Sequence, residues 1–366
     1  MTPQALIETL RQRVLLADGA MGTRLMSHEL HERPECSDKT ATHDHGLTAG
    51  NTAGDRAEAR ESGNVEQRRT VDESVRVPEQ WLLRFPERIG QIHRSYVAAG
   101  SDVICTATFG ANRARIATWG HASQIDEIHR IAVRLSKEAA VGAVLVAGDV
   151  GPSGWITPRS VPPSDAQLET CFREQCDCLA NHGVDLILVE TMYSLREATC
   201  AVRAAQRTGL AVIASMTFAP SGWNGAQEPR TVDGFATPLG EPPSLCVQPL
   251  VDAGATVVGS NCWLTPHQIL PVIQAMATVS GTTPLLAKPQ ACETLPASSQ
   301  TSQASTCAQP EHFGTNCAHL VQAGARIVGG CCGTDQRHVH SIAQSLSVLG
   351  LRAQRARVLS ESVTTG

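Results

Sequence analysis

A short apolar run carries the pattern that decides the fold: Val184-Asp185-Leu186-Ile187-Leu188-Val189-Glu190-Thr191. Its centre is apolar at consecutive positions rather than alternate ones, which is typical of a parallel strand buried on both faces. A helical pattern precedes the run, near residues 165–182, and another follows it, near residues 195–208. The run therefore predicts one βα unit of an α/β domain, with an acid at the carboxyl end of its strand.

Seven further runs of the same kind occur along the chain, each followed by a helical pattern. They lie at residues 14–19, 102–109, 144–150, 211–218, 257–262, 284–289 and 326–328. Eight βα units predict a (β/α)8 TIM barrel over about residues 1–350. A doubly wound open sheet is the alternative, but no Gly-x-Gly-x-x-Gly follows the first strand to mark a dinucleotide site. Residues 36–77 are polar and aperiodic and predict a disordered insertion, and residues 351–366 predict a loose tail.

The composition excludes several classes of partner. The net charge of -5 gives no electrostatic basis for binding nucleic acid or an anionic membrane. No apolar stretch reaches the roughly 20 residues that cross a bilayer, and the N-terminal region lacks the apolar block of a signal peptide. The 13 cysteines are irregularly spaced, which indicates free thiols in a reducing cytoplasm rather than a disulfide framework. We therefore expect a cytoplasmic protein.

Two cysteine-bearing segments end the sixth and eighth strands. The sixth strand ends in Gly259-Ser260-Asn261-Cys262, and the eighth leads into Gly329-Gly330-Cys331-Cys332-Gly333. The carboxyl ends of barrel strands share one mouth, so Cys262, Cys331 and Cys332 can meet there as three thiolate ligands of a soft metal. Three protein ligands with one open position are typical of a catalytic zinc. The alternative is that these are ordinary buried cysteines, which applies best to Cys262 taken alone. We assign the other ten cysteines to packing.

Three thiolates on zinc leave room for the thiol of a substrate, whose pKa would fall on binding. A thiolate held in this way attacks an activated carbon, which predicts alkyl transfer to sulfur.

Asp18 and Glu190, at the ends of the first and fourth strands, could bind an ammonium group, and backbone N–H groups after Asp18 could receive a carboxylate. A thiol-bearing amino acid fits this outline. Each acid also has a structural interpretation, Asp18 as a helix cap and Glu190 as the partner of a buried base. Other polar residues at strand ends are Thr106, Thr108, Asp149, Thr217 and Lys288.

Three blocks of the sequence resemble the signature blocks of the homocysteine S-methyltransferase family. They are Asp18-Gly19-Ala20-Met21-Gly22-Thr23, Gly259-Ser260-Asn261-Cys262 and Gly329-Gly330-Cys331-Cys332-Gly333-Thr334. The resemblance covers nearly the whole chain outside residues 36–77. It implies a zinc-dependent TIM-barrel enzyme that methylates homocysteine to give methionine.

The resemblance also implies roles for individual residues. It makes Cys262, Cys331 and Cys332 the Zn2+ ligands. The amino and carboxylate groups of homocysteine would be held by Asp18, Gly19 and Glu190. Asn261, beside the first zinc ligand, joins the substrate-binding residues. Two positions depart from the family pattern, since Ala107 stands where members often carry Asn, and Gln290 stands where they often carry Asn within Pro-Asn-Ala-Gly.

The family implies several possible methyl donors: methyltetrahydrofolate through cobalamin, betaine, or a sulfonium. We expect a sulfonium, S-methylmethionine or S-adenosylmethionine, because a chain of 366 residues has no room for separate folate and cobalamin modules. A corrinoid route would need a separate partner protein. Aromatic faces attract a cationic donor, and Trp155, Trp223 and Trp263 follow the third, fifth and sixth strands. Betaine, another thiol acceptor, and a non-enzymatic zinc- or thiol-binding barrel are the alternatives.

Overall fold

The structure is a computed structural model that describes residues 1–26, 78–156, 161–220, 234–292 and 307–352. The insertion predicted at 36–77 lies outside the described residues. So does the predicted tail from residue 353 onward, and so does Trp223.

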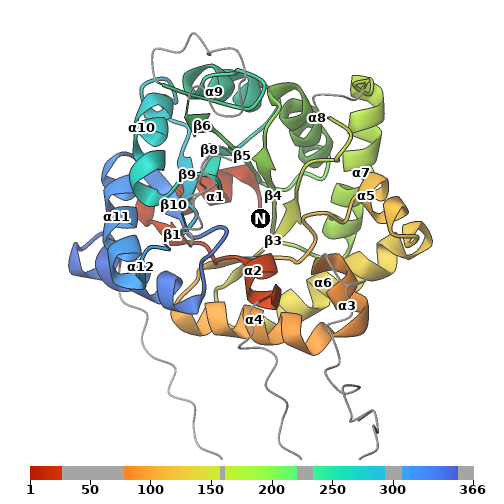
Figure 1. Ribbon diagram of the computed structural model, residues 1–366, viewed down its shortest axis with the longest axis horizontal. Coiled ribbons are helices and arrows are strands. Elements are labelled where there is room, and N and C mark those ends of the chain that lie inside the picture. The colour runs from red at the N-terminus through yellow and green to blue at the C-terminus, as the bar shows by residue number, and fades with distance from the viewer. Residues whose placement is uncertain (27–77, 157–160, 221–233, 293–306, 353–366) are drawn as a thin grey trace, which may run out of the picture.

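The eight predicted strands form one parallel sheet that curls into a barrel, with helices around its outer face (Figure 1). Their order is β1-β10-β9-β8-β5-β4-β3-β2. A parallel bridge between Ala17 and Val103 joins the first strand to the second and closes the ring. The predicted TIM barrel is therefore confirmed. The strands are β1 (Leu15–Leu16), β2 (Val103–Cys105), β3 (Leu145–Val150), β4 (Leu186–Met192), β5 (Val212–Met216), β8 (Val257–Asn261), β9 (Leu285–Lys288) and β10 (Ala325–Val328).

The helices lie between successive strands, as the alternating pattern predicted. Several begin at a side chain that satisfies free backbone N–H groups, such as the capping boxes opened by Ser164 and Asp335. No described helix combines the length and the apolar character needed to cross a membrane. The helices after the first are α2 (Met21–Met26), α3 (Pro78–Arg84), α4 (Pro86–Ala99), α5 (Arg113–Thr118), η2 (Ala122–Gln124), α6 (Ile125–Ala139), α7 (Asp165–Asn181), α8 (Leu195–Gln206), α9 (Pro243–Asp252), α10 (Pro266–Ala277), α11 (Pro310–Gln322) and α12 (Gln336–Val348).

The first helix, α1 (Pro3–Gln12), packs against the amino ends of the strands. Its Leu6 and Leu10 are buried in the same apolar cluster as the inward residues of the barrel. The Arg326 guanidinium at the start of β10 donates hydrogen bonds to the Leu10 carbonyl at 2.9 and 2.7 Å. The helix thereby closes the end of the barrel opposite the predicted site. A two-stranded antiparallel sheet of β6 (Ala219–Pro220) and β7 (Phe235–Ala236) was not predicted.

Side chains along each strand alternate between the barrel interior and the layer of helices. In β3, Leu145 and Ala147 pack in the interior cluster, whereas Val146 packs in the outer one. The next inward position is Asp149, because strand side chains repeat every two residues. The same alternation turns Glu190 of β4 inward above Leu186 and Leu188. It likewise carries Asn261 of β8 and Lys288 of β9 to the barrel mouth.

Candidate active site

The three predicted zinc ligands meet at the carboxyl ends of β8 and β10. The sulfurs of Cys262, Cys331 and Cys332 all lie within 4.8 Å of one another. The Sγ atoms of Cys262 and Cys332 are 3.5 Å apart. Tetrahedral thiolate ligands of one zinc ion lie about 3.8 Å apart, because each Zn–S bond is about 2.3 Å long. The geometry and chemistry of these three sulfurs therefore fit a single zinc ion.

The backbone after β8 adopts an unusual conformation that aims Cys262 at this cluster. Cys262 and Trp263 have φ values of 61° and 52°, in the left-handed region that non-glycine residues seldom occupy. Such residues cost about 1–3 kcal/mol each and persist only where their surroundings hold them. The Cys262 N–H is held by the Lys288 carbonyl at 3.0 Å. On the β10 side, the Cys331 N–H donates to the Pro289 carbonyl at 2.8 Å.

The glycines before the cysteine pair let this loop approach the first strand. A Cβ at Gly329 would lie 2.8 Å from the Ala17 Cβ and 2.9 Å from the Asp18 carbonyl oxygen. Gly19 is equally confined, since a Cβ there would lie 2.7 Å from Thr334 Oγ1. The first and eighth strands can therefore bring Asp18 and the cysteine pair to one mouth only with glycine at these positions.

The pKa values of the clustered thiols are shifted in opposite directions by their contacts with one another. Hydrogen bonds from Cys262 and Cys331 lower the pKa of Cys332 to about 3. The same contacts raise the pKa of Cys262, first through Cys331 and then through Cys332. Cys332 is the exposed member of the group and Cys262 is buried. Cys332, on the open side of the cluster, is thus the thiol most readily ionised, and the thiolate is the form of cysteine that binds metals.

The two predicted ammonium-binding acids converge at the mouth, and a lysine lies between them. Lys288 Nζ is 3.1 Å from Glu190 Oε2 and 3.7 Å from Asp18 Oδ1. Asp18 is fixed by its other oxygen, which accepts a hydrogen bond from the Cys105 N–H at 2.7 Å. All three charged side chains are buried. The sequence placed Lys288 at a strand end without giving it a role.

Burial dominates the electrostatics of this charged group. It raises the pKa of Asp18 and of Glu190, and the ammonium of Lys288 acts in the opposite direction on both. Burial also acts to lower the pKa of Lys288, but the surrounding Cys105, Glu190 and Asp18 outweigh it and raise that pKa well above its usual value. Lys288 is therefore a cation in the free protein.

Asn261 links three strands next to the three clustered cysteines. Its Oδ1 accepts hydrogen bonds from the Thr191 N–H at 2.8 Å and the Ser215 hydroxyl at 2.7 Å. Its Nδ2 donates to Thr191 Oγ1 at 2.7 Å and lies 3.8 Å from Cys331 Sγ. These contacts give Asn261 a positioning role in the free protein, and its contact with substrate stays a prediction.

The tryptophans proposed to meet a cationic donor lie in different places. Trp263 follows Cys262 directly and is half-buried, and its carbonyl accepts a hydrogen bond from Gln290 Nε2 at 2.7 Å. Trp155 lines a surface groove of about 1060 Å³ beside α5 and α7, and that lining includes none of the three clustered cysteines. Of the two proposed tryptophans that lie within the described residues, Trp263 is the better candidate.

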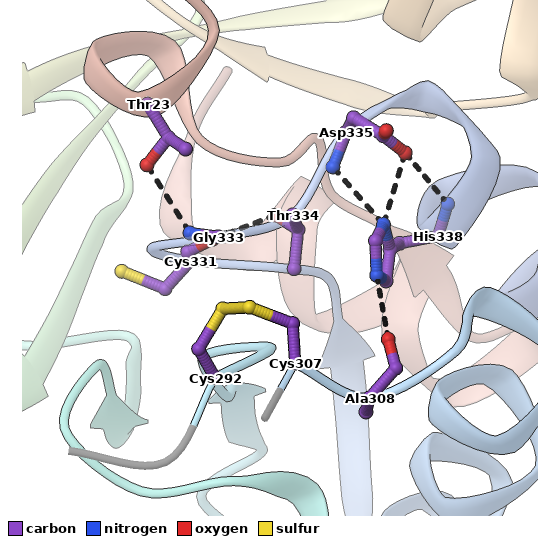
Figure 2. The surroundings of a disulfide bond; sticks show 9 residues. All are labelled: Thr23, Cys292, Cys307, Ala308, Cys331, Gly333, Thr334, Asp335 and His338. Atoms are coloured by element: carbon purple, nitrogen blue, oxygen red, sulfur yellow. Dashed lines mark hydrogen bonds and ion pairs between the residues drawn. A yellow bond between two sulfur atoms is a disulfide. The ribbon is translucent and has the colours of Figure 1, made fainter. Parts of the chain in front are cut away.

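A disulfide beside the loop of Cys331 and Cys332 corrects one expectation. Cys292 and Cys307 are bonded, with their Cα atoms 3.9 Å apart, although we assigned both to packing as free thiols. They face each other in an isolated antiparallel bridge, so the two ends of the connection after β9 meet beside the loop of Cys331 and Gly333 (Figure 2). A Cβ at Gly333 would lie 2.7 Å from Cys292 Sγ. The irregular cysteine spacing gave no signal for this pair.

Comparison with known proteins decides the family. The family model of the homocysteine S-methyltransferases matches residues 15–346. The chain belongs to the homocysteine S-methyltransferase family. Betaine–homocysteine S-methyltransferase 1 of Mus musculus is 27% identical over 305 residues, which cover 77% of this chain and 70% of the relative. The Danio rerio enzyme of the same name is 28% identical over 300 residues, with the same coverage.

Solved structures of the Escherichia coli homocysteine methyltransferase MmuM share the fold of this family member. The oxidised form aligns with a TM-score of 0.65 at 20% identity, covering 94% of this chain and 99% of MmuM. The metallated form aligns with a TM-score of 0.63 at 20% identity. The family, the methyltransferase class and the barrel fold predicted from the sequence are thus confirmed, and homocysteine is the methyl acceptor of the family.

Proposed function

We propose that the protein binds one Zn2+ through Cys262, Cys331 and Cys332 and moves a methyl group from a cationic donor to the thiol of homocysteine. The observation that carries this proposal is the meeting of three sulfurs within 4.8 Å at a mouth that also holds two buried carboxylates. When bound, zinc would supply Lewis-acid chemistry by accepting the homocysteine sulfur and lowering its pKa.

The chain's own residues would bind and orient the amino acid. Asp18 and Glu190 would receive the ammonium group, because their carboxylates converge on one cation in the free protein. The backbone N–H of Gly19, directly after Asp18, would receive the carboxylate of homocysteine. Asn261 would fix the end of β8 against Thr191 of β4, and so fix the position of Cys262, the first proposed zinc ligand. This arrangement fixes the acceptor sulfur and leaves the donor to approach from the open side of the mouth.

The transfer balances with a cationic donor and no oxidant. The homocysteine thiol loses its proton to solvent, and its sulfur forms a bond to the methyl carbon. The bond from that carbon to the donor sulfonium or ammonium breaks, and the electron pair stays with the donor, which leaves without its positive charge. The products are methionine and the demethylated donor.

We propose S-methylmethionine or S-adenosylmethionine as the donor. Asp18, Asp149 and Glu190 outnumber the single Lys288 at the mouth, so the site carries an excess of acidic groups that favours a cation. Trp263 offers an aromatic ring beside the first zinc ligand. Betaine has the same cationic chemistry and is the second candidate, because the Mus musculus and Danio rerio relatives are named for it. A methyl-corrinoid partner protein is the remaining route.

The test is zinc content measured together with methionine formation, one donor at a time. Wild type should bind about one zinc per chain, and Cys331→Ser should lose both zinc and activity. Cys178→Ser, at a half-buried position on α7, is the matched control and should keep both. A Cys331→Ser variant with full zinc and activity would overturn the proposal.

The same assay separates the alternatives. The productive donor among S-methylmethionine, S-adenosylmethionine and betaine identifies the donor class. Turnover only with methylcobalamin would point to a corrinoid partner. Zinc binding without turnover on any donor would favour a non-enzymatic zinc- or thiol-binding barrel, and preference for another thiol would change the acceptor.

A further inference from the structure

The ammonium of Lys288 occupies the place that the proposed function gives to the ammonium of homocysteine. Lys288 Nζ lies 3.1 Å from Glu190 Oε2 and 3.7 Å from Asp18 Oδ1. Two ammonium groups cannot share this position, because like charges repel strongly where burial excludes water. Binding of homocysteine by Asp18 and Glu190 therefore requires Lys288 to move.

A third carboxylate is available to receive it. Asp149 is 7% exposed, and its Oδ1 is buried without a hydrogen-bond partner among the described residues. A buried carboxylate without a partner is costly unless a cation reaches it. Asp149 therefore offers an unfilled place for a cation within the mouth.

Asp149 is also held in a fixed position beside Glu190. Thr106 Oγ1 accepts a hydrogen bond from the Asp149 N–H at 2.9 Å, and the Thr108 hydroxyl donates to the Asp149 carbonyl at 2.7 Å. Its strand, β3, pairs with β4, where Asp149 stands opposite the inward Leu188, one inward position before Glu190. Burial raises the pKa of Asp149 well above its usual value, nearby Glu190 raises it further, and the Lys288 ammonium lowers it and so favours the Asp149 carboxylate. A shift of Lys288 from Glu190 to Asp149 would thus carry its ammonium from an acid on β4 to an acid on the adjacent strand, β3.

We propose that Lys288 is an exchangeable counter-ion that pairs with Asp18 and Glu190 in the free protein and with Asp149 when homocysteine is bound. The inference rests on the proposed function, which places the homocysteine ammonium at Asp18 and Glu190. The flexible four-carbon stem of lysine suits this exchange. Lys288 and Asp149 act through the substrate-binding acids, so both are positioning residues.

The first test measures binding to the zinc-loaded protein by titration calorimetry. Homocysteine is compared with 4-mercaptobutyrate, which keeps the thiol and the carboxylate but lacks the amino group. Asp149→Asn removes the destination of Lys288, so homocysteine should bind at least about tenfold more weakly. Binding of 4-mercaptobutyrate should change by less than about twofold, because this ligand does not displace Lys288. Adding Lys288→Met to Asp149→Asn should restore homocysteine binding, because the competing ammonium is gone.

The opposite results would overturn the inference. An Asp149→Asn variant with unchanged homocysteine affinity and a raised KM for the donor would place the donor cation at Asp149 instead. Failure of Lys288→Met to restore binding in the double variant would also contradict the exchange. A wild-type protein that binds neither zinc nor homocysteine would instead contradict the proposed function, so the two failures are distinguishable.

A second test uses the wild-type protein and does not depend on the folding of a variant. The chain has three lysines, Lys39, Lys137 and Lys288, so NMR spectra of the labelled lysine side chains should contain three signals. Lys137 is an internal control, because it pairs with Asp185 at 2.8 Å outside the mouth. The Lys288 signal should shift when homocysteine binds to the zinc-loaded protein and stay in place when 4-mercaptobutyrate binds. Identical responses to the two ligands would show that Lys288 does not exchange partners.

Discussion

Asn261 and Thr191 are joined by two reciprocal hydrogen bonds across the ends of β8 and β4. The Thr191 N–H donates to Asn261 Oδ1 at 2.8 Å, and Asn261 Nδ2 donates to Thr191 Oγ1 at 2.7 Å. Thr191 has a φ of 59°, and Cys262, the residue after Asn261, has a φ of 61°. The pair therefore stabilises two left-handed residues, Thr191 directly after Glu190 and Cys262, the first proposed zinc ligand.

Replacing Asn261 with Ala should loosen this end of the barrel and weaken zinc binding. The Thr191 N–H and the Ser215 hydroxyl would lose their acceptor, and an unpaired buried polar group costs about 1–3 kcal/mol. We expect the free energy of unfolding to fall by about 2–4 kcal/mol and zinc affinity to fall by about 10–100-fold. Urea unfolding and a zinc-chelator competition measure the two effects. Asn181→Ala, at an exposed position, should change neither, and wild-type zinc affinity in Asn261→Ala would show that the link does not position Cys262.

Removing the disulfide with the double change Cys292→Ser and Cys307→Ser should also weaken the zinc site. The Ala291 N–H, next to Cys292, donates to the Cys332 carbonyl at 2.8 Å, so the disulfide fixes a residue that supports a proposed zinc ligand. The bond spans 15 residues, a loop for which its loss costs about 3 kcal/mol. Chelator competition should show faster zinc loss, and a reducing agent should reproduce it in wild type. Cys178→Ser controls for the loss of a thiol. Equal rates of zinc loss in wild type, Cys178→Ser and the double variant would contradict the prediction.

Replacing Glu190 with Gln should affect only acceptors that carry an amino group. The carboxylate is buried, and removing one partner of a buried charge pair costs about 2–5 kcal/mol. The kcat/KM for homocysteine should fall by about 30-fold or more, while the rate with 4-mercaptobutyrate should change little. Glu311→Gln, exposed on α11, is the control. An equal loss with both acceptors would mean that Glu190 supports the site as a whole rather than binding the ammonium.

Most of the framework could be predicted because it follows from local patterns. Consecutive apolar residues marked each buried parallel strand, and the strand ends placed Glu190 and the three cysteines at one barrel mouth, where the structure has them. Their roles in binding zinc and substrate stay predictions. The pairing of Cys292 with Cys307 could not be predicted, because it depends on two distant segments meeting at the mouth. The position of Lys288 between two acids is also a property of the closed ring, since its neighbours come from β1 and β4. The sequence showed a lysine and two acids at strand ends. Their contact could be inferred only from the order of the strands around the barrel.

The pH dependence of stability should reveal a buried neutral histidine between α4 and α6. His93 is fully buried, with Nε2 3.1 Å from Ser136 Oγ. Burial lowers its pKa to about 3, whereas an unfolded chain has a histidine pKa of about 6.5. Between these values the unfolded chain binds a proton that the folded protein does not. The free energy of unfolding contributed by His93 therefore falls as the pH drops below about 6.5, by up to about 1.4 kcal/mol per pH unit.

His93→Gln should remove this contribution, so its stability difference from wild type should change with pH in the same window. Urea unfolding from pH 4.5 to 8 measures that difference. Wild type should lose stability relative to His93→Gln as the pH falls from about 6.5, by up to about 1.4 kcal/mol per unit, and the difference should be constant above pH 7.5. His312→Gln, exposed on α11, is the matched control for the loss of a histidine. Parallel profiles for wild type and His93→Gln would mean that His93 takes up its proton in the folded protein as readily as in the unfolded chain.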